Sequence, residues 1–252
     1  MVKVSIIGSG NVAQHLIAAF LKSDEIELVQ VFARNPRALL NIVEASNVTS
    51  ELSALIEADL YIIAISDDAV QGVSRMLPFD NRLVVHTSGT LPADTIDAKN
   101  RSGVFYPIQT FSKRKPLDFA KIPVLIESSE PNDYAMLQKV AGAISHNITS
   151  LSFTQRQALH VAAVFVNNFT NHLFVLADKI CNENQISFDL LRPLIHETAE
   201  KVMQLSPKDA QTGPAIRKDQ STIDAHLDLL SDQNQMNIYK TLTHSIQYES
   251  RL

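Results

Sequence analysis

Short apolar runs alternate with amphipathic stretches through the first part of the chain. Six of these runs predict buried strands: Lys3–Ile7, Leu28–Phe32, Asp59–Ile65, Leu83–Val85, Val104–Tyr106 and Pro123–Ile126. Apolar positions at helical spacing predict helices between the early strands: Asn11–Leu21, Pro36–Glu44 and Asp68–Met76. Because strands and helices alternate, we expect right-handed crossovers and an α/β fold, a doubly wound parallel sheet with helices on both faces.

The pattern changes after about residue 151, where helical spacing takes over. Ser152 begins a capping-box pattern, which predicts a helix that runs to about Ile180. The middle of this helix, His160–Leu176, is apolar on nearly every face, so we expect it to be buried, in part against a second copy of the chain. The chain therefore divides into a sheet domain, residues 1–152, and a smaller all-helical domain, residues 153–252.

Glycine is scarce, and its placement is informative. Only 7 glycines occur in 252 residues, yet Gly8 and Gly10 stand one residue apart between the first predicted strand and helix. With Ala13 they form G-x-G-x-x-A, in which the first Gly permits a tight turn and the second lets a pyrophosphate approach the backbone. The helix N-terminus, with Asn11 and Val12, would offer its free N–H groups to the phosphates. The alternative is an ordinary strand–helix turn.

The end of the second predicted strand distinguishes between the two nicotinamide nucleotides. An NAD site usually places an acid there, but this strand is followed by Arg34, Asn35 and Arg37. Arg34 could stack on adenine and pair with a 2′-phosphate, and Asn35 could donate a hydrogen bond to the same group. The sequence therefore predicts NADP(H), although a solvated basic turn would have the same composition, above all at Arg37.

The other strand ends should lie along the same edge of the sheet, where open parallel sheets bind ligands. The polar side chains that we expect there are Ser66, Asp67, His86, Ser88 and Gln109. His86 and Ser88 are candidates for contact with nicotinamide or substrate, and Gln109 belongs to a loop that could cover the site. Asp67 could instead only cap a helix, and the loop that carries Gln109 could be a structural turn.

The long predicted helix carries the candidate catalytic residues. His160, Asn167 and Asn171 lie within about 40° of one another on an otherwise apolar helix. Such polar groups need partners, which are either neighbouring protein groups or the contents of a cavity. In a cavity His160 could protonate the group being reduced, while Asn167 or Asn168 orients the substrate. Asn171 is a further candidate for binding the substrate. The alternative is a core histidine that is satisfied by its neighbours.

A second unusual segment lies near the end of the chain. Thr212 and Gly213 precede a proline in a rigid turn with an exposed hydroxyl and backbone N–H. Arg217 follows the turn and could bind an acidic group of the substrate. It could equally pair with a carboxylate at a contact between the domains.

Composition excludes several other classes of protein. A single cysteine, Cys181, rules out a disulfide framework, and the dispersed histidines do not suggest a catalytic metal. A net charge of −5 argues against nucleic acid as the main partner. No uninterrupted apolar run approaches the roughly 20 residues of a membrane span, so we expect a cytoplasmic protein.

Taken together, these segments resemble the Rossmann-type NADP oxidoreductases with a C-terminal helical domain of unknown function. These proteins are distant relatives of pyrroline-5-carboxylate reductase and of the 6-phosphogluconate dehydrogenase superfamily. The resemblance rests on Gly8–Ala13, Ala33–Asn35, Asp59–Ile65, His86–Gly89, Tyr106–Phe111, His160 with Asn167–Phe169, and Thr212–Ala215 with Arg217 and Asp219. It implies a homodimer joined through the long helices, and it implies no particular substrate.

One departure from the superfamily concerns the mechanism. Its β-hydroxyacid dehydrogenase branch places a catalytic lysine on the long helix, whereas this helix has His160 and no lysine before Lys179. The lysine-based mechanism is therefore not carried over to this chain. From the site residues and the resemblance together, we expect an NADPH-dependent reductase of a C=O or C=N bond in a small, acidic metabolite, with His160 as proton donor. The alternatives are a protein that senses NADPH without turnover and a dehydrogenase that works in the opposite direction.

Overall fold

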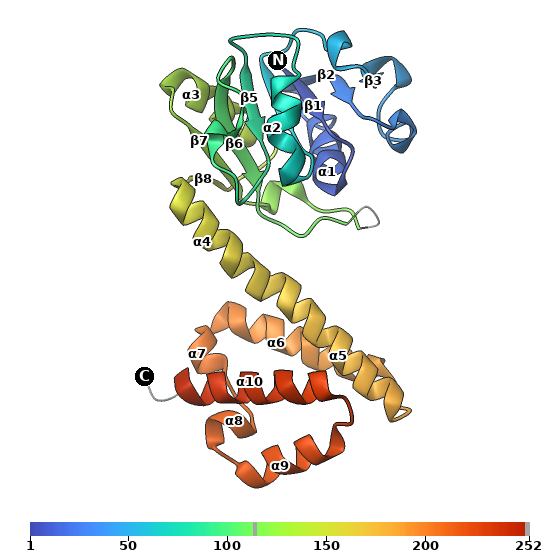
Figure 1. The fold of residues 1–252 in the computed structure, drawn as a ribbon, viewed down its shortest axis with the longest axis vertical. Coiled ribbons are helices and arrows are strands. Elements are labelled where there is room, and N and C mark those ends of the chain that lie inside the picture. Colours follow the sequence, from blue (N-terminus) through green and yellow to red (C-terminus); the bar gives the residue numbers. More distant parts are fainter. Residues whose placement is uncertain (113–114, 250–252) are drawn as a thin grey trace. The chain divides into compact units, whose positions relative to one another are not determined.

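The computed structural model describes residues 1–112 and 115–249 (Figure 1). The chain divides into two compact units, Met1–Asn167 and Asn168–Leu252. The sequence placed its boundary earlier, after residue 152. The difference arises because the first turns of the long helix belong to the same compact unit as the sheet.

The first unit is built on one eight-stranded sheet. Its strands are β1 (Val2–Ile7), β2 (Ile26–Phe32), β3 (Val48–Thr49), β4 (Leu60–Ile63), β5 (Leu83–His86), β6 (Arg101–Pro107), β7 (Val124–Ser128) and β8 (Ile148–Ser150). They lie in the order β3-β2-β1-β4-β5-β6-β7-β8, and all neighbours are parallel except β6 and β7. The strand order reverses at β1 and β4, which is where a doubly wound sheet forms its ligand-binding crevice.

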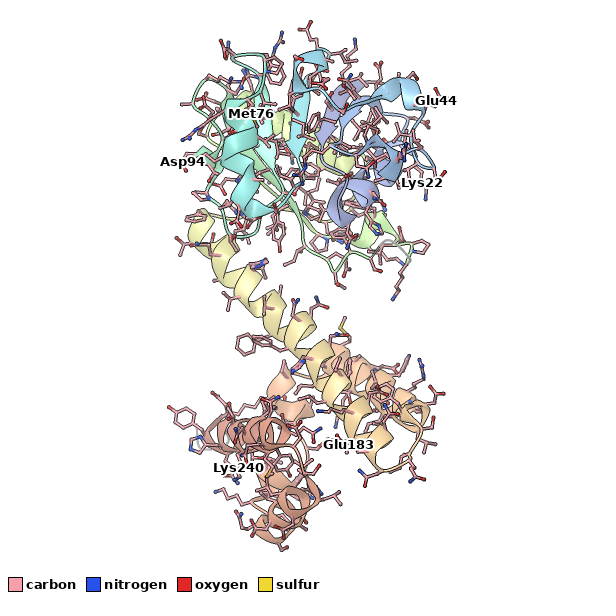
Figure 2. All side chains as sticks on the ribbon, turned by 45° about the vertical axis from the view of Figure 1, so that its right-hand side comes forward. Lys22, Glu44, Met76, Asp94, Glu183 and Lys240 are labelled. Atoms are coloured by element: carbon pink, nitrogen blue, oxygen red, sulfur yellow. The ribbon has the colours of Figure 1, made fainter. Side chains whose placement is uncertain are left out.

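Helices cover both faces of this sheet. They are α1 (Asn11–Phe20), α2 (Asp67–Arg75) and α3 (Pro131–Gly142). In the central strands β1, β2, β4 and β5, buried residues belong to two separate hydrophobic layers on opposite faces of the sheet. In β4, for example, Leu60 and Ile62 face the layer that contains residues of α1 and α3, whereas Tyr61 and Ile63 face the layer that contains Val70 of α2. This arrangement confirms the predicted Rossmann-type α/β fold, and charged side chains such as Lys22, Glu44 and Asp94 remain on the outside (Figure 2).

Three sequence predictions about the sheet unit were incomplete or wrong. Strand β7 runs antiparallel to β6, because the segment between them returns without a crossover helix. Strands β3 and β8 are too short to leave an apolar run in the sequence. The helix predicted over Pro36–Glu44 is a 3-10 turn, Pro36–Ala38, followed by irregular chain. Its apolar positions, Leu39 and Val43, pack into the core without forming a helix.

The long helix begins as predicted. Ser152 Oγ accepts a hydrogen bond from the Gln155 backbone N–H, and the Gln155 side chain accepts one from the Ser152 N–H. The helical segment comprises α4 (Phe153–Ala163), a π-helical turn (Val164–Phe169) and α5 (Thr170–Glu183). Phe153–Glu183 is long and apolar enough to cross a membrane by length and composition alone, although polar residues interrupt its apolar positions.

The second unit is helical. After α5 it contains α6 (Arg192–Gln204), α7 (Pro207–Ala210), α8 (Pro214–Arg217), α9 (Gln220–Leu229) and α10 (Gln233–Glu249). Within its described part, the buried side chains are Cys181, Ala215, Ile223 and Gln235. Large apolar side chains stay exposed, including Val175, Leu190 and Leu194. The expectation that the long helix is buried is therefore not met within a single chain.

Candidate active site

The turn between β1 and α1 depends on two glycines for different reasons. Gly8 has φ +141°, and a Cβ there would lie 2.1 Å from the carbonyl oxygen of Ala64. Gly8 therefore lets β1 end close against the strand next to it. A Cβ on Gly10 would meet nothing within 4 Å, so this position has open space above its backbone. The space is what a bound phosphate requires.

The N-terminus of α1 is open to the same space. Gly10 is its N-cap and supplies no side chain to the first N–H groups of the helix, which remain available to an anion. The Asn11 side chain points elsewhere, since its Nδ2 donates to the carbonyl oxygen of Phe111 at 2.9 Å. This bond fixes the loop after β6 beside the helix N-terminus. The local structure thus fits the diphosphate of a dinucleotide.

A cavity of about 780 Å³ lies at this edge of the sheet. Its lining includes nine residues that the sequence predicted for the site: Gly8, Gly10, Asn11, Val12, Arg34, Ser66, Asp67, Ser88 and His160. We call this cavity the cleft. These residues come from the ends of β1, β2, β4 and β5 and from α4, so the fold brings together segments that are far apart in sequence.

The end of β2 supplies the basic group of the cleft. Arg34 lines the cleft and is exposed, whereas Asn35 and Arg37 are not among its lining residues. Asn35 is occupied locally, because its Oδ1 accepts the backbone N–H of Arg37 at 3.2 Å. Arg34 is therefore the side chain best placed to pair with a 2′-phosphate. A direct contact from Asn35 stays a prediction.

An acidic group links the loops that follow β4 and β5. Asp67 Oδ2 accepts hydrogen bonds from Ser88 Oγ at 2.7 Å and from Thr90 Oγ1 at 2.6 Å. Asp67 also stands in the first turn of α2, where a carboxylate is stabilised by the helix dipole. Ser66, and not Asp67, is the N-cap of α2, so the capping role that the sequence allowed for Asp67 is not found, whereas Asp67 does line the cleft.

His86 is adjacent to the cleft but does not line it. The side chain is fully buried, its Nδ1 accepts the Ser88 N–H at 3.2 Å, and its Nε2 donates to the Pro92 carbonyl at 3.1 Å. Burial, helped by the nearby Arg156 guanidinium, lowers the pKa of His86 to about 4, against the raising effects of the Pro92 carbonyl and Asp67. His86 is thus a neutral imidazole that shapes the loop after β5, and its direct contact with nicotinamide or substrate stays a prediction.

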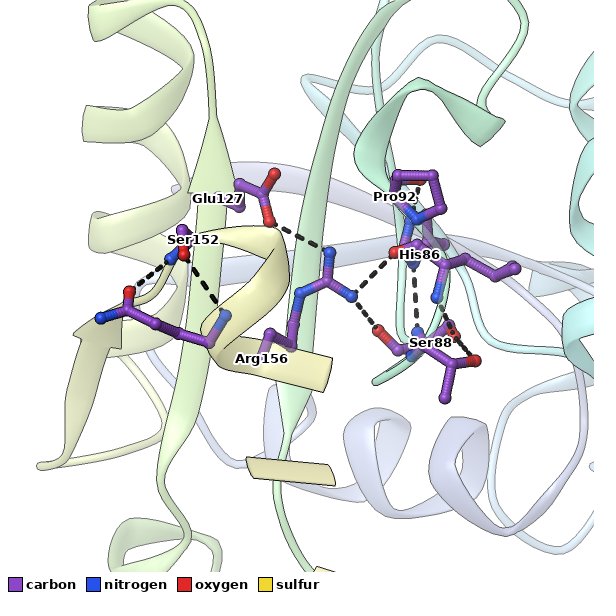
Figure 3. A network of polar contacts seen from close by, with 9 residues as sticks. His86, Ser88, Pro92, Glu127, Ser152 and Arg156 are labelled. Atoms are coloured by element: carbon purple, nitrogen blue, oxygen red, sulfur yellow. Dashed lines mark hydrogen bonds and ion pairs between the residues drawn. The ribbon is translucent and has the colours of Figure 1, made fainter. Parts of the chain in front are cut away.

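Arg156 joins α4 to the sheet. Its side chain is 1% exposed, and its Nη1 donates to the carbonyl oxygens of Ser88 at 2.9 Å and Leu91 at 2.8 Å (Figure 3). On the other side, Nη2 pairs with Oε2 of Glu127 on β7 at 3.0 Å. One guanidinium therefore ties the loop after β5 and the first turns of α4 to the sheet. It also fixes the part of α4 that carries His160 one turn later.

Tyr106 and His160 form a polar pair in the wall of the cleft. The hydroxyl of Tyr106, near the end of β6, lies 3.0 Å from Nδ1 of His160. Gly89 packs against both rings, since a Cβ there would lie 2.5 Å from His160 Nδ1 and 3.0 Å from Tyr106 Cζ. Burial raises the pKa of Tyr106, with Arg156 acting to lower it and Asp67 to raise it. The phenol therefore keeps its proton at neutral pH.

The remaining predicted site residues are not among those that line the cleft. Gln109 is exposed, and its Oε1 accepts the neighbouring Thr110 N–H at 2.8 Å. Asn167 belongs to the π-helical turn at the end of the first unit and is not among the residues that line the cleft. The others belong to the second unit: Asn171, Thr212, Gly213 and Arg217. Their roles toward a substrate stay predictions.

Sequence reasoning missed three contributors to the site. Tyr106 was predicted only as the end of a strand and as part of a segment that carries the family resemblance, and no role was assigned to its hydroxyl. Gly89 could have been predicted, because a chain with only 7 glycines is expected to have them where a side chain does not fit. Arg156 precedes His160 by four residues, which places both on the same side of a helix. No sequence signal showed that their common side faces the sheet.

Comparison with known proteins agrees with this geometry. Residues 3–89 match the family described as NADP oxidoreductase, coenzyme F420-dependent, and residues 122–246 match a domain of unknown function. No curated protein matches. A solved structure from Bacteroides fragilis, assigned as an NADP oxidoreductase, is 36% identical, covers 98% of both chains and superposes with a TM-score of 0.87. The chain belongs to this family of NADP oxidoreductases.

More distant structures share the fold of this NADP oxidoreductase. A reductive aminase from Aspergillus terreus, solved with NADPH, is 17% identical over 99% of this chain and 94% of its own, with a TM-score of 0.68. A pyrroline-5-carboxylate reductase from Coxiella burnetii is 12% identical over 99% and 97%, with a TM-score of 0.57. The protein is thus an oxidoreductase that uses NADP(H), for which the glycine turn and Arg34 form a fitting site.

Proposed function

We propose that this NADP oxidoreductase uses NADPH to reduce a C=N or C=O bond of a small, acidic metabolite. The observation that carries the proposal is the composition of the cleft. One end has the glycine turn and Arg34, and the wall contributed by β6 and α4 has the Tyr106–His160 pair. A protein that only sensed NADPH would have no need of a proton-carrying pair beside its nucleotide site.

The residues of the chain divide the work between binding and proton transfer. NADPH supplies a hydride when bound. The N–H groups at the start of α1 hold the diphosphate, and Arg34 holds the 2′-phosphate. His160 holds a proton for the nitrogen or oxygen of the reduced bond. Holding donor and acceptor in contact supplies much of the rate enhancement, as positioning generally does.

The distant relatives direct the choice of substrates. A reductive aminase and a pyrroline-5-carboxylate reductase have the same fold, which makes C=N compounds the first class to examine. The name of the pyrroline-5-carboxylate reductase denotes a substrate that carries a carboxylate. In this chain Arg217, exposed in the helical unit, is the group that we propose for binding such an acid.

A substrate screen that follows the loss of NADPH absorbance tests the proposal. We expect turnover with cyclic imines, with mixtures of ketones and amines, or with 2-oxo acids, and faster turnover with the acid than with its ester. Arg217→Ala should raise KM for the acid and leave KM for the ester unchanged. Tight NADPH binding without turnover of any of these classes would contradict the reductase and favour a sensor.

We also propose that the protein is a homodimer that works in the cytoplasm. The apolar side chains left exposed in the helical unit support the dimer, and a second copy of the chain is the partner that we propose for them. The single cysteine, Cys181, is buried and free, as suits a reducing compartment.

A further inference from the structure

The Tyr106–His160 pair has a geometry that restricts where its protons lie. The phenol oxygen and Nδ1 are 3.0 Å apart, a hydrogen-bonding distance, and the two rings are tilted by 57° at a centroid separation of 6.1 Å. The two residues are 54 positions apart and come from β6 and α4. The sheet and the Arg156 anchor therefore hold the contact, so it does not depend on a flexible loop.

The direction of this hydrogen bond follows from the state of the phenol. Burial keeps Tyr106 protonated at neutral pH, so its O–H is a donor that requires an acceptor. Within the described part of the chain, Nδ1 of His160 is the acceptor that the structure offers. A neutral imidazole has one N–H, and a ring that accepts at Nδ1 carries its hydrogen at Nε2.

We propose that Tyr106 is a positioning residue that fixes neutral His160 in the Nε2–H tautomer, so that this N–H serves as the proton donor of the cleft. The inference about the tautomer rests on the geometry of the pair and on the protonated phenol, and it does not depend on the proposed function. The role as a proton donor rests on the proposed function. Gly89 is part of the arrangement, because any Cβ at that position would displace the Nδ1 side of the ring.

The Tyr106–His160 hydrogen bond also provides a proton to replace the one that His160 gives to the substrate. A neutral imidazole that loses its only N–H would become a strongly basic anion. Here the Nε2 proton would pass to the nitrogen or oxygen of the double bond while the Tyr106 proton passes to Nδ1. NADPH, held by the glycine turn and Arg34, would supply the hydride to the carbon. Water then returns a proton to Nε2, and Nδ1 gives its proton back to the Tyr106 phenolate, which restores the starting tautomer.

Nitrogen NMR of ¹⁵N-histidine-labelled protein tests the tautomer without any substrate. Spectra are recorded about two pH units above the ordinary histidine pKa, where the rings are neutral, and His160→Gln identifies the signals of His160. We expect the wild type to show the Nε2–H form. Tyr106→Phe keeps the ring but removes the hydroxyl, and it should convert His160 to a mixture of both tautomers.

The chain provides a matched control in its helical unit. Tyr239 Oη lies 2.8 Å from Nδ1 of His226, a pair of the same chemistry outside the cleft. Tyr239→Phe should alter the signals of His226 and leave those of His160 unchanged. An Nδ1–H form of His160 in the wild type, or a tautomer that does not respond to Tyr106→Phe, would overturn the inference.

Kinetics separates this inference from the proposed function. Once a substrate is known, we expect Tyr106→Phe to lower kcat by about 10–100-fold with little change in KM for NADPH, because it weakens a general acid and leaves the nucleotide site intact. An unchanged kcat would contradict the role as a proton donor. If no substrate is turned over but the NMR result holds, the reductase proposal fails and the assignment of the tautomer stands.

Discussion

Gly89 shows how strongly the cleft depends on a single missing side chain. Its backbone lies against the imidazole of His160 and the ring of Tyr106, and it belongs to the loop whose carbonyls Arg156 holds. Neither ring can move far, because one is on a strand and the other on an anchored helix. Added volume at Gly89 must therefore change the Tyr106–His160 contact.

We predict that Gly89→Ala disrupts the Tyr106–His160 hydrogen bond. The added Cβ would lie 2.5 Å from Nδ1, so overpacking should cost about 1–3 kcal/mol of unfolding free energy. It should also lower kcat at least tenfold. Gly72→Ala is the matched control, because its Cβ would meet nothing within 4 Å on helix α2, where alanine stabilises by about 0.5–1 kcal/mol. Urea unfolding and turnover of both variants measure the difference; equal behaviour would contradict the prediction.

Arg34 should decide between NADPH and NADH. It lines the cleft, and removing its guanidinium should weaken NADPH binding by about 10–100-fold, equal to roughly 1.4–2.8 kcal/mol, while leaving NADH binding unchanged. Arg37→Ala removes the same charge three residues later, outside the lining of the cleft, and should have little effect. Calorimetric titration of both variants with both nucleotides provides the comparison. A loss of NADPH affinity that is equal in the two variants would show that only general charge is involved.

His86 makes the free energy of unfolding depend on pH, independently of any catalysed reaction. Its pKa is about 4 in the folded chain, against an ordinary value of 6.5 for a solvated histidine, so the unfolded chain binds the proton more readily between these values. Stability is therefore lost as pH falls through this window, by about 2 kcal/mol between pH 7 and pH 5. His86→Asn should remove that part of the pH dependence in urea unfolding. A wild type and variant with parallel stability curves would contradict it.

At the scale of elements, α4 is connected to the sheet by one buried guanidinium. We predict that Arg156→Met destabilises the fold by about 2–3 kcal/mol, below the usual cost for a buried pair because the Glu127 side chain is 27% exposed and can be hydrated. Combining it with Glu127→Gln should cost less than the sum of the two single variants, since the charge that remains after the first change is removed by the second. A double-mutant cycle in urea tests this, and strict additivity would contradict it.

The elements also show how much the sequence can reveal. Each predicted strand was found, because a buried strand leaves a continuous apolar run in the sequence. The antiparallel direction of β7 could not be predicted, since periodicity is the same in both directions. In the site, the glycine turn was predictable because its spacing is local. The contact of Tyr106 with His160 was not, since it depends on which side of α4 faces the sheet, and Arg156 determines that through tertiary contacts alone.

At the scale of the whole molecule, the helical unit buries few of its apolar side chains within a single chain. Its described residues include four buried side chains, which is few for a domain of this size. Val166 is 75% exposed at the border of the units, and Leu173 on α5 is 38% exposed. Burying such side chains contributes about 1.5–3 kcal/mol each, so an association through several of them would be stable.

We therefore expect light scattering to give the mass of a dimer at micromolar concentrations. The double variant Val166→Lys and Leu173→Lys should shift the protein toward monomer, because a lysine ammonium cannot be buried in an apolar contact without a partner. Leu21→Lys is the control: it changes an exposed leucine at the end of α1, in the sheet unit, and should leave the mass unchanged. A monomeric wild type over the whole concentration range would contradict the dimer. In that case the exposed apolar side chains need a partner other than a second copy of this chain.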